Sequence, residues 1–250
     1  MKVFLENPNL LIKEFNEMAA IAQKKAFITV GTEIQKEEIE IIKSYRGELC
    51  ELKKQFVEKK QENEANLIYN IDRSLLAVQH ELQMLVNIKE DRMSEAWANL
   101  VNAQVTYGTV VRNYPFEFET ANGYVERLEA YEKLLFPKMF FSSVGGIIKK
   151  SNCSICKEPY SKCNHIKGRL YNGELCVREI TEMDLEEVSL VDIPANKLCR
   201  MMTTSYDGKN VDLLTLREEA QTANKSIAAS GAEGNSIGCS SLSAAVPADE

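Results

Sequence analysis

The sequence lacks the features typical of membrane and exported proteins. It contains no run of about 18 apolar residues, the length needed to cross a bilayer as a helix. Its first fifteen residues, MKVFLENPNLLIKEF, include no long apolar core and no small-residue cleavage site, so we expect no signal peptide. We therefore expect a cytoplasmic protein without membrane contacts, in a reducing compartment where a disulfide framework does not form.

The sequence also has no excess of basic residues and few of the common catalytic motifs. Its 30 Lys and Arg residues against 37 Asp and Glu residues give a net charge of −7, which excludes a basic footprint over the whole chain. It has no glycine-rich phosphate loop and no H-E-x-x-H motif, and His80 and His165 are its only histidines. These absences favour a protein without catalytic activity over an enzyme.

Apolar residues are present with helical spacing over much of residues 9–112. Two series step by three and four residues, as in a coiled-coil seam: Ile42, Tyr45, Leu49, Leu52 and Phe56, then Ile71, Leu75, Val78, Leu82 and Leu85. Between them, residues 58–66 contain no large apolar side chain, so residues 33–88 form either a hairpin or one long rod. With a further short helix at 120–135, we expect a helical bundle or coiled-coil hairpin over residues 1–136, with helices that pair within the chain or between chains.

Beyond the helices the sequence changes character. Residues 137–148 are expected to form a connector, either a strand or a loop, and residues 149–205 a small β module. Its signals are the Asn172-Gly173 hairpin turn and strand candidates at 187–191 and 198–202. Residues 206–250, which become rich in Ser, Ala and Gly and carry a net charge of −4 from residue 211 onward, are expected to be an acidic, largely disordered tail. The predicted class is mainly α with a small zinc-stabilised β unit (α+β).

The cysteines indicate a metal site. Of seven, four lie between positions 153 and 176, and the pattern Cys153-x2-Cys156-x6-Cys163-x-His165 is typical of a structural zinc site with three Cys and one His. Cys176 is the alternative fourth ligand, which would give a four-cysteine site. Four strong ligands leave no open position for a substrate, and a histidine in the set favours Zn²⁺ over an iron–sulfur cluster. Cys50, Cys199 and Cys239 are interpreted as ordinary reduced cysteines.

One short segment resembles a known family. The string EEVSLVDIPAN at residues 186–196 resembles a motif of tailed-phage prohead maturation proteases, in which a strand of the form E-V-S-L-V leads into a P-A-N turn. The resemblance implies that Ser189 matches the nucleophile of a β-barrel enzyme with its catalytic histidine on an earlier strand. In this sequence the first 135 residues read as helical, His80 lies on a helix and His165 lies among the metal ligands. We therefore interpret the segment as a strand and turn shared in form, with a divergent or inactive serine peptidase as an alternative function.

The leading hypothesis is a non-catalytic zinc-binding interaction or assembly protein whose partner is another protein or a second copy of itself. An alternative is a nucleic-acid-associated zinc protein. Residues 151–178 carry five basic residues against two acidic ones, and Tyr160 and Tyr171 are available to stack on bases.

Overall fold

The computed structural model describes residues 8–113 and 118–218 of the chain. Its first half consists of helices: α1 Pro8–Lys24, α2 Glu33–Glu58, α3 Glu62–Lys89, α4 Met93–Asn113 and α5 Phe118–Leu135. No helix in the described ranges is both long enough and apolar enough to span a membrane. The combination of these helices with small antiparallel sheets confirms the predicted α+β class.

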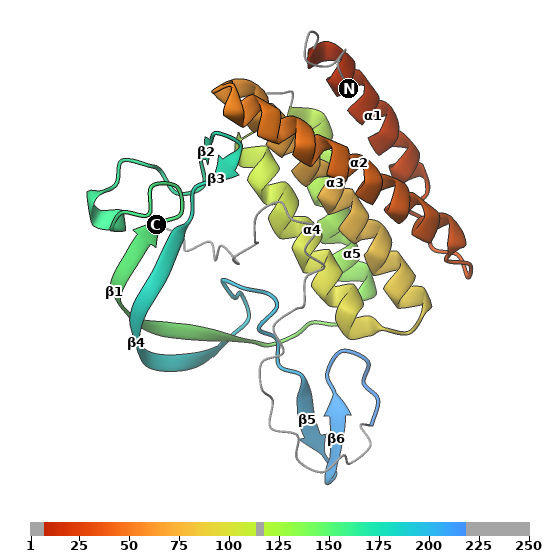
Figure 1. Cartoon of the computed structure of the whole chain (residues 1–250). Helices are drawn as coiled ribbons and strands as arrows, with labels where there is room; N and C mark the ends of the chain where they lie inside the picture. Colours follow the sequence, from red (N-terminus) through yellow and green to blue (C-terminus); the bar gives the residue numbers. More distant parts are fainter. Residues whose placement is uncertain (1–7, 114–117, 219–250) are drawn as a thin grey trace.

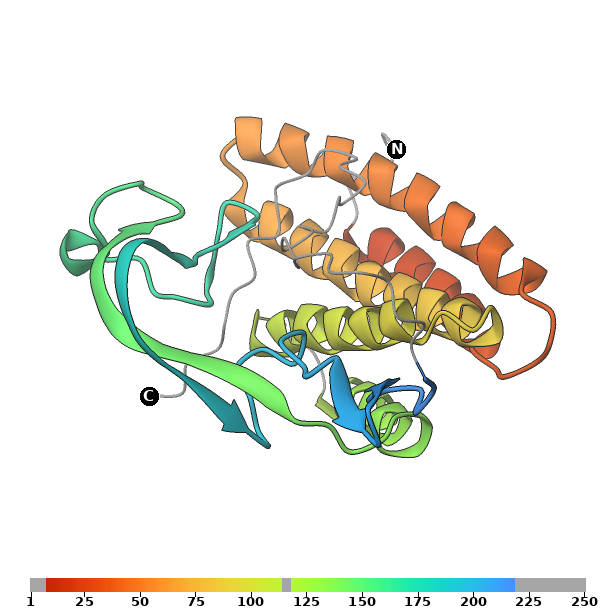
Figure 2. The ribbon, with the colours of Figure 1, turned by 90° about the horizontal axis from the view of Figure 1, so that it is seen from below.

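Residues 33–88 form a hairpin. The chain turns back over Lys59–Gln61, where Lys60 takes a left-handed φ of 57° and the Gln61 amide donates to the Phe56 carbonyl oxygen at 2.9 Å. Because the turn reverses the chain, the two apolar series face each other in the core, where Ile42, Leu49, Leu75 and Leu82 are all at most 2% exposed. Figures 1 and 2 show α2, α3, α4 and α5 packed side by side.

The main β element is a long two-stranded ribbon beside the helices. Strand β1 (Phe141–Cys153) pairs antiparallel with β4 (Arg178–Val191), from Phe141 opposite Val191 to Cys153 opposite Arg178. Register shifts interrupt the pairing after Gly145 and on both sides of Lys150, and the ribbon curves away from the bundle and back (Figures 1 and 2). Strand β1 thus begins within the segment 137–148, for which the sequence predicts a connector that is either a strand or a loop.

One local prediction is wrong: residues 198–202 do not form a strand. They contribute a single bridge, from Arg200 to Phe141. The first residues of the predicted tail are ordered, since β5 (Thr203–Tyr206) and β6 (Lys209–Asp212) form a hairpin and a turn follows it. The remainder of the predicted tail, residues 219–250, lies outside the described residues.

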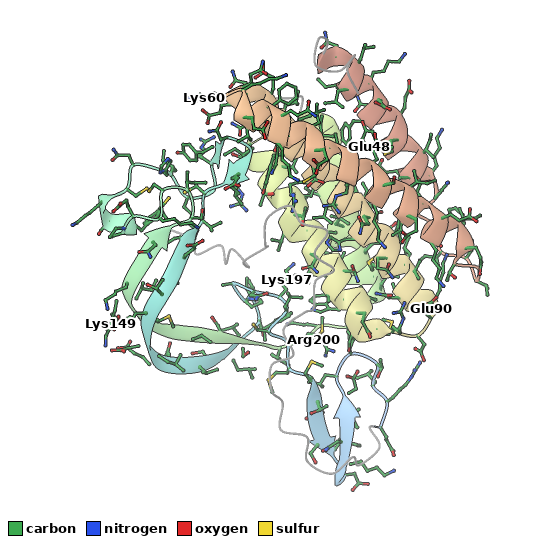
Figure 3. All side chains as sticks on the ribbon, in the orientation of Figure 1. Glu48, Lys60, Glu90, Lys149, Lys197 and Arg200 are labelled. Atoms are coloured by element: carbon green, nitrogen blue, oxygen red, sulfur yellow. The ribbon has the colours of Figure 1, made fainter. Side chains whose placement is uncertain are left out.

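The base of the ribbon is fixed to the helices. Trp97 of α4 packs against Phe136 and Phe141, with ring centroids 5.3 and 6.2 Å apart, and its indole N–H donates to the Lys197 carbonyl oxygen at 2.9 Å. The Lys197 ammonium lies 2.7 Å from the Glu132 carboxylate, and the Arg200 guanidinium donates to Ser94 Oγ at 2.9 Å; Figure 3 labels both basic residues. The turn after β4 therefore holds the start of the ribbon against α4 and α5.

Candidate metal centre

The first two predicted ligands lie on one tight turn at the end of β1. The Lys157 amide donates to the Cys153 carbonyl oxygen at 2.9 Å, and Lys157 adopts a left-handed φ of 61°. The Ile155 amide points at Cys153 Sγ at 3.4 Å. This turn explains the x2 spacing, because it directs the Cys153 and Cys156 side chains toward one point.

The second pair of ligands returns to the same point. A short 3₁₀ helix, η2 (Tyr160–Lys162), reverses the chain before Cys163. Cys163 Sγ lies 3.5 Å from Cys156 Sγ and 3.2 Å from His165 Nδ1, and it accepts the His165 amide at 3.1 Å. All four donor atoms lie within 4.8 Å of one another. The structure therefore brings together the quartet predicted from the sequence, and this cluster can hold a metal ion.

Cys176 lies beside the quartet as a fifth donor. Its buried Sγ is 3.8 Å from Cys153 Sγ. A small hairpin places it there: β2 (Leu170–Tyr171) and β3 (Glu174–Leu175) are joined by the predicted Asn172-Gly173 turn, with both φ angles positive at 51° and 72°. Both candidates for the fourth ligand are therefore close to the cluster.

The thiols of the cluster influence one another's ionisation. Burial, together with the neighbouring Cys153 sulfur, raises the pKa of Cys176 to about 12 and that of Cys163 to about 11. Burial also opposes ionisation of Cys153, but backbone amides of Cys156 and Ile155 donate to its sulfur and bring its pKa to about 6. One thiolate thus forms readily and disfavours the next, a repulsion that a bound cation offsets.

The segment that carries the cluster, residues 153–177, is called here the metal module, and it docks on the helices. Gly173 is central: its amide donates to Asn66 Oδ1 at 2.7 Å, and its carbonyl oxygen accepts from Lys53 Nζ at 3.0 Å. Asn113 Nδ2 of α4 donates to the Gly168 carbonyl oxygen at 2.8 Å. These contacts join residues more than 50 positions apart, so no local signal in the sequence predicts them.

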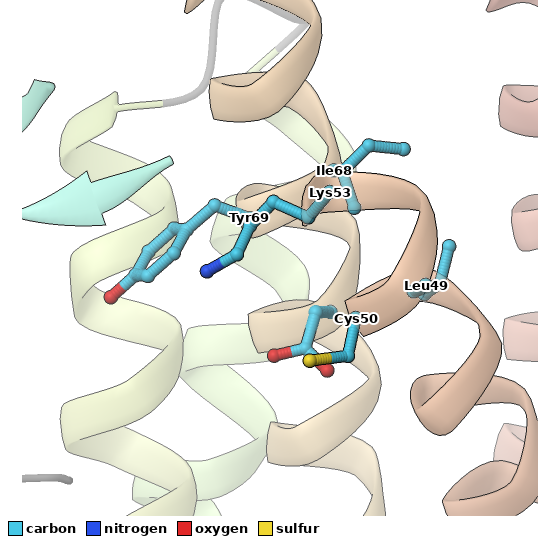
Figure 4. A pocket seen from close by; sticks show the side chains of 6 residues that line it. Leu49, Cys50, Lys53, Ile68 and Tyr69 are labelled. Atoms are coloured by element: carbon cyan, nitrogen blue, oxygen red, sulfur yellow. The ribbon is translucent and has the colours of Figure 1, made fainter. Parts of the chain in front are cut away.

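A hollow between α2 and α3 lies next to the contact between Gly173 and the helices (Figure 4). It is lined by Leu49, Cys50, Lys53, Ile68, Tyr69 and Asp72. The Lys53 ammonium, 5.7 Å from the centre of the Tyr69 ring, is the same group that binds the Gly173 carbonyl. We therefore interpret the hollow as part of the contact between the helical bundle and the metal module.

The residues tied to the peptidase alternative are not brought together. Ser189 lies half-buried on β4, opposite Ser143 on the neighbouring strand. His80 Nδ1 lies 2.8 Å from Asn99 Oδ1 between α3 and α4, where burial lowers its pKa to about 4, and His165 Nδ1 contacts Cys163. Each histidine thus has a partner other than the serine.

The remaining cysteines in the described ranges lie outside the cluster: Cys50 on α2, and Cys199 at the base of the ribbon, where its carbonyl oxygen accepts the Ser142 amide at 2.8 Å. Cys239 is not among the described residues. Comparison of the chain with protein-family models, with curated proteins and with solved structures returns no match.

Proposed function

We propose that the chain is a non-catalytic zinc-binding interaction protein, in which one Zn²⁺ ion is held by Cys153, Cys156, Cys163 and His165. The donor set is the observation that carries the proposal. Thiolates about 2.3 Å from a zinc ion lie about 3.8 Å apart at the corners of a tetrahedron. The Cys156 and Cys163 sulfurs are 3.5 Å apart, which is close to this separation.

A structural role for the ion follows from its surroundings. Four strong protein ligands leave no position for water or substrate. The metal module has few buried apolar side chains, so a bound ion supplies stability that packing does not. The ion would hold the module in the shape that meets Asn66 and Lys53 on the helices.

An interaction role fits the surface better than nucleic-acid binding does. Basic residues near the cluster are already engaged: Lys157 lies 3.1 Å from the Glu179 carboxylate, and Arg178 covers the Tyr160 ring. On the ribbon, Lys150 and Lys149 are likewise paired with Glu182 and Asp184. The ribbon instead carries exposed apolar side chains, among them Val144, Leu185 and Val188.

Metal analysis of the full chain tests this proposal. We expect native mass spectrometry to show one zinc ion per chain, Cys163→Ser to lose it, and Cys199→Ser to retain it. Cys199→Ser is the matched control because it removes an exposed thiol outside the cluster. A chain that binds no metal, or two variants with equal metal content, would contradict the assignment.

A further inference from the structure

The two faces of the β1–β4 ribbon differ in composition. Side chains alternate along each strand, and residues directly opposite each other share a face. The face that contains Val144 and its partner Val188 is apolar over most of its length. We call it the apolar face, and its members on β1, β4 and the segment bridged to β1 are Phe140, Val144, Ile148, Met183, Leu185, Val188, Leu190 and Met201. The other face carries Asp184 and Glu187.

The apolar face is exposed. Val144 is 58% exposed, and Leu185, Val188 and Leu190 are each 62% exposed. At the base, Phe140 and Met201 extend the face across a third segment, because the Met201 amide donates to the Phe140 carbonyl oxygen at 2.8 Å. An antiparallel sheet normally buries its apolar face, and contiguous exposed apolar patches of this kind mark interaction sites.

We infer that the apolar face packs against the same face of a second copy of this chain, forming a two-fold four-stranded sandwich. The inference deepens the proposed interaction role and rests on it. Among the paired ribbon positions on this face, from Phe140 to Ile148 and from Met183 to Leu190, none is charged, and Glu186 lies at the bulge without a paired position. A charged partner therefore finds nothing to pair with, whereas a second copy meets no like charge in an isologous contact.

Other occupants of the face are less well supported by the sequence. Residues 219–250 contain only four large aliphatic residues (Ile227, Ile237, Leu242 and Val246) and no aromatic residue. A segment of that composition has too few apolar side chains to cover the eight members of the face.

Pairing through the strand edge is also disfavoured. Strand β4 carries five acidic residues within nine positions, and such charges on an edge oppose the addition of another copy of the same strand. On β1, the edge at Ser142 is already bonded to the Cys199 carbonyl oxygen. The face, and not the edge, is therefore the surface through which two copies can meet.

Sedimentation velocity of the full chain tests the inference, at about 1 to 100 μM, because small interfaces of this kind give weak binding. We expect a concentration-dependent monomer–dimer equilibrium. Val188→Lys places a charge at the centre of the apolar face and is expected to weaken dimerisation at least tenfold. Ile147→Lys is the matched control, since Ile147 is similarly exposed (57%) but lies on the opposite face.

Three outcomes would overturn the inference: a monomer over the whole concentration range, a dimer weakened equally by both variants, or slow hydrogen exchange at 183–190 that does not depend on concentration. The last result would indicate cover by the chain's own residues. Zinc content, measured on the same samples, shows that the variants fold and reports separately on the proposed metal role.

Discussion

At the scale of single residues, His165 and Cys176 are the two candidates for the fourth metal ligand. His165 belongs to the compact set of four donors, whereas Cys176 lies against Cys153 on the buried side. We expect His165→Ala to weaken Co²⁺ and Zn²⁺ binding by more than about 100-fold, because loss of a direct ligand exceeds the effect of losing an outer contact. We expect Cys176→Ser to retain the ion. Titration with Co²⁺ measures both, since its absorption spectrum reports the number of thiolate ligands.

Cys199→Ser serves as the control for both variants, because it changes a thiol that does not contact the cluster. If Cys176→Ser lost the ion and His165→Ala kept it, the ion would be held by four cysteines. His165 would then pack against the Tyr171 ring, whose centre lies 4.6 Å from its own, without binding the ion.

Residue-level prediction from the sequence worked where the chemistry is local. The C-x2-C and C-x-H spacings predict that the side chains of each pair converge because each pair occupies one turn, and the donor atoms of Cys153, Cys156, Cys163 and His165 lie within 4.8 Å of one another. The docking of Gly173 on Asn66 was not predictable in the same way. It depends on how the whole ribbon curves.

At the scale of elements, the sequence signals do not show how far the strands extend. Gly145 and Gly146 lie within β1, and a Cβ on Gly146 would lie 2.2 Å from the Asp184 carbonyl oxygen, so glycine permits the strands to approach there. The strand predicted at 187–191 is the end of the longer β4, because bulges near Thr181 and Glu186 disturb the alternation along it.

The β5–β6 hairpin, in contrast, had a signal that could have been used. Asp207 and Gly208 take φ angles of 49° and 73°, as expected for the favoured Asp-Gly hairpin turn.

The element-level prediction concerns the turn that docks the metal module. Gly173 has φ of +72°, and a Cβ there would lie 3.1 Å from the Ala65 carbonyl oxygen and 2.9 Å from Lys53 Cδ. We expect Gly173→Ala to lower the free energy of unfolding by about 1–2 kcal/mol beyond the backbone cost alone. Urea denaturation measures the loss, and hydrogen exchange of residues 168–176 should become faster.

Gly168→Ala is the control for this experiment. Gly168 lies in the same module with φ of +84°, but a Cβ there meets no atom within 4 Å. It therefore has only the backbone cost of about 1–2 kcal/mol. Equal losses in the two variants would mean that the close approach to α3 contributes nothing to stability.

At the scale of the whole molecule, the ribbon is attached to the bundle at two points with different chemistry. The base is apolar, with Trp97, Phe136 and Phe141 in ring contact and continuous with the helical core. The tip is polar and depends on the hydrogen bond that the Gly168 carbonyl oxygen accepts from Asn113 and the one that the Gly173 amide donates to Asn66, so the metal module must hold both glycines in position. Removal of a metal ion should therefore affect the two attachments unequally.

Trp97 is the only tryptophan of the chain and lies at the base, 2% exposed, so its fluorescence reports on that attachment alone. We expect chelation to leave its emission and the helical circular dichroism unchanged, because the core of the bundle includes no residue of the metal module. Hydrogen exchange of residues 153–176 should become at least tenfold faster, since the module has few apolar contacts of its own. Cys163→Ser without chelator should reproduce this pattern, which separates loss of the ion from side effects of the chelator. A simultaneous shift of the Trp97 emission would show instead that the base and the tip unfold as one cooperative unit, and that the ion stabilises the whole chain.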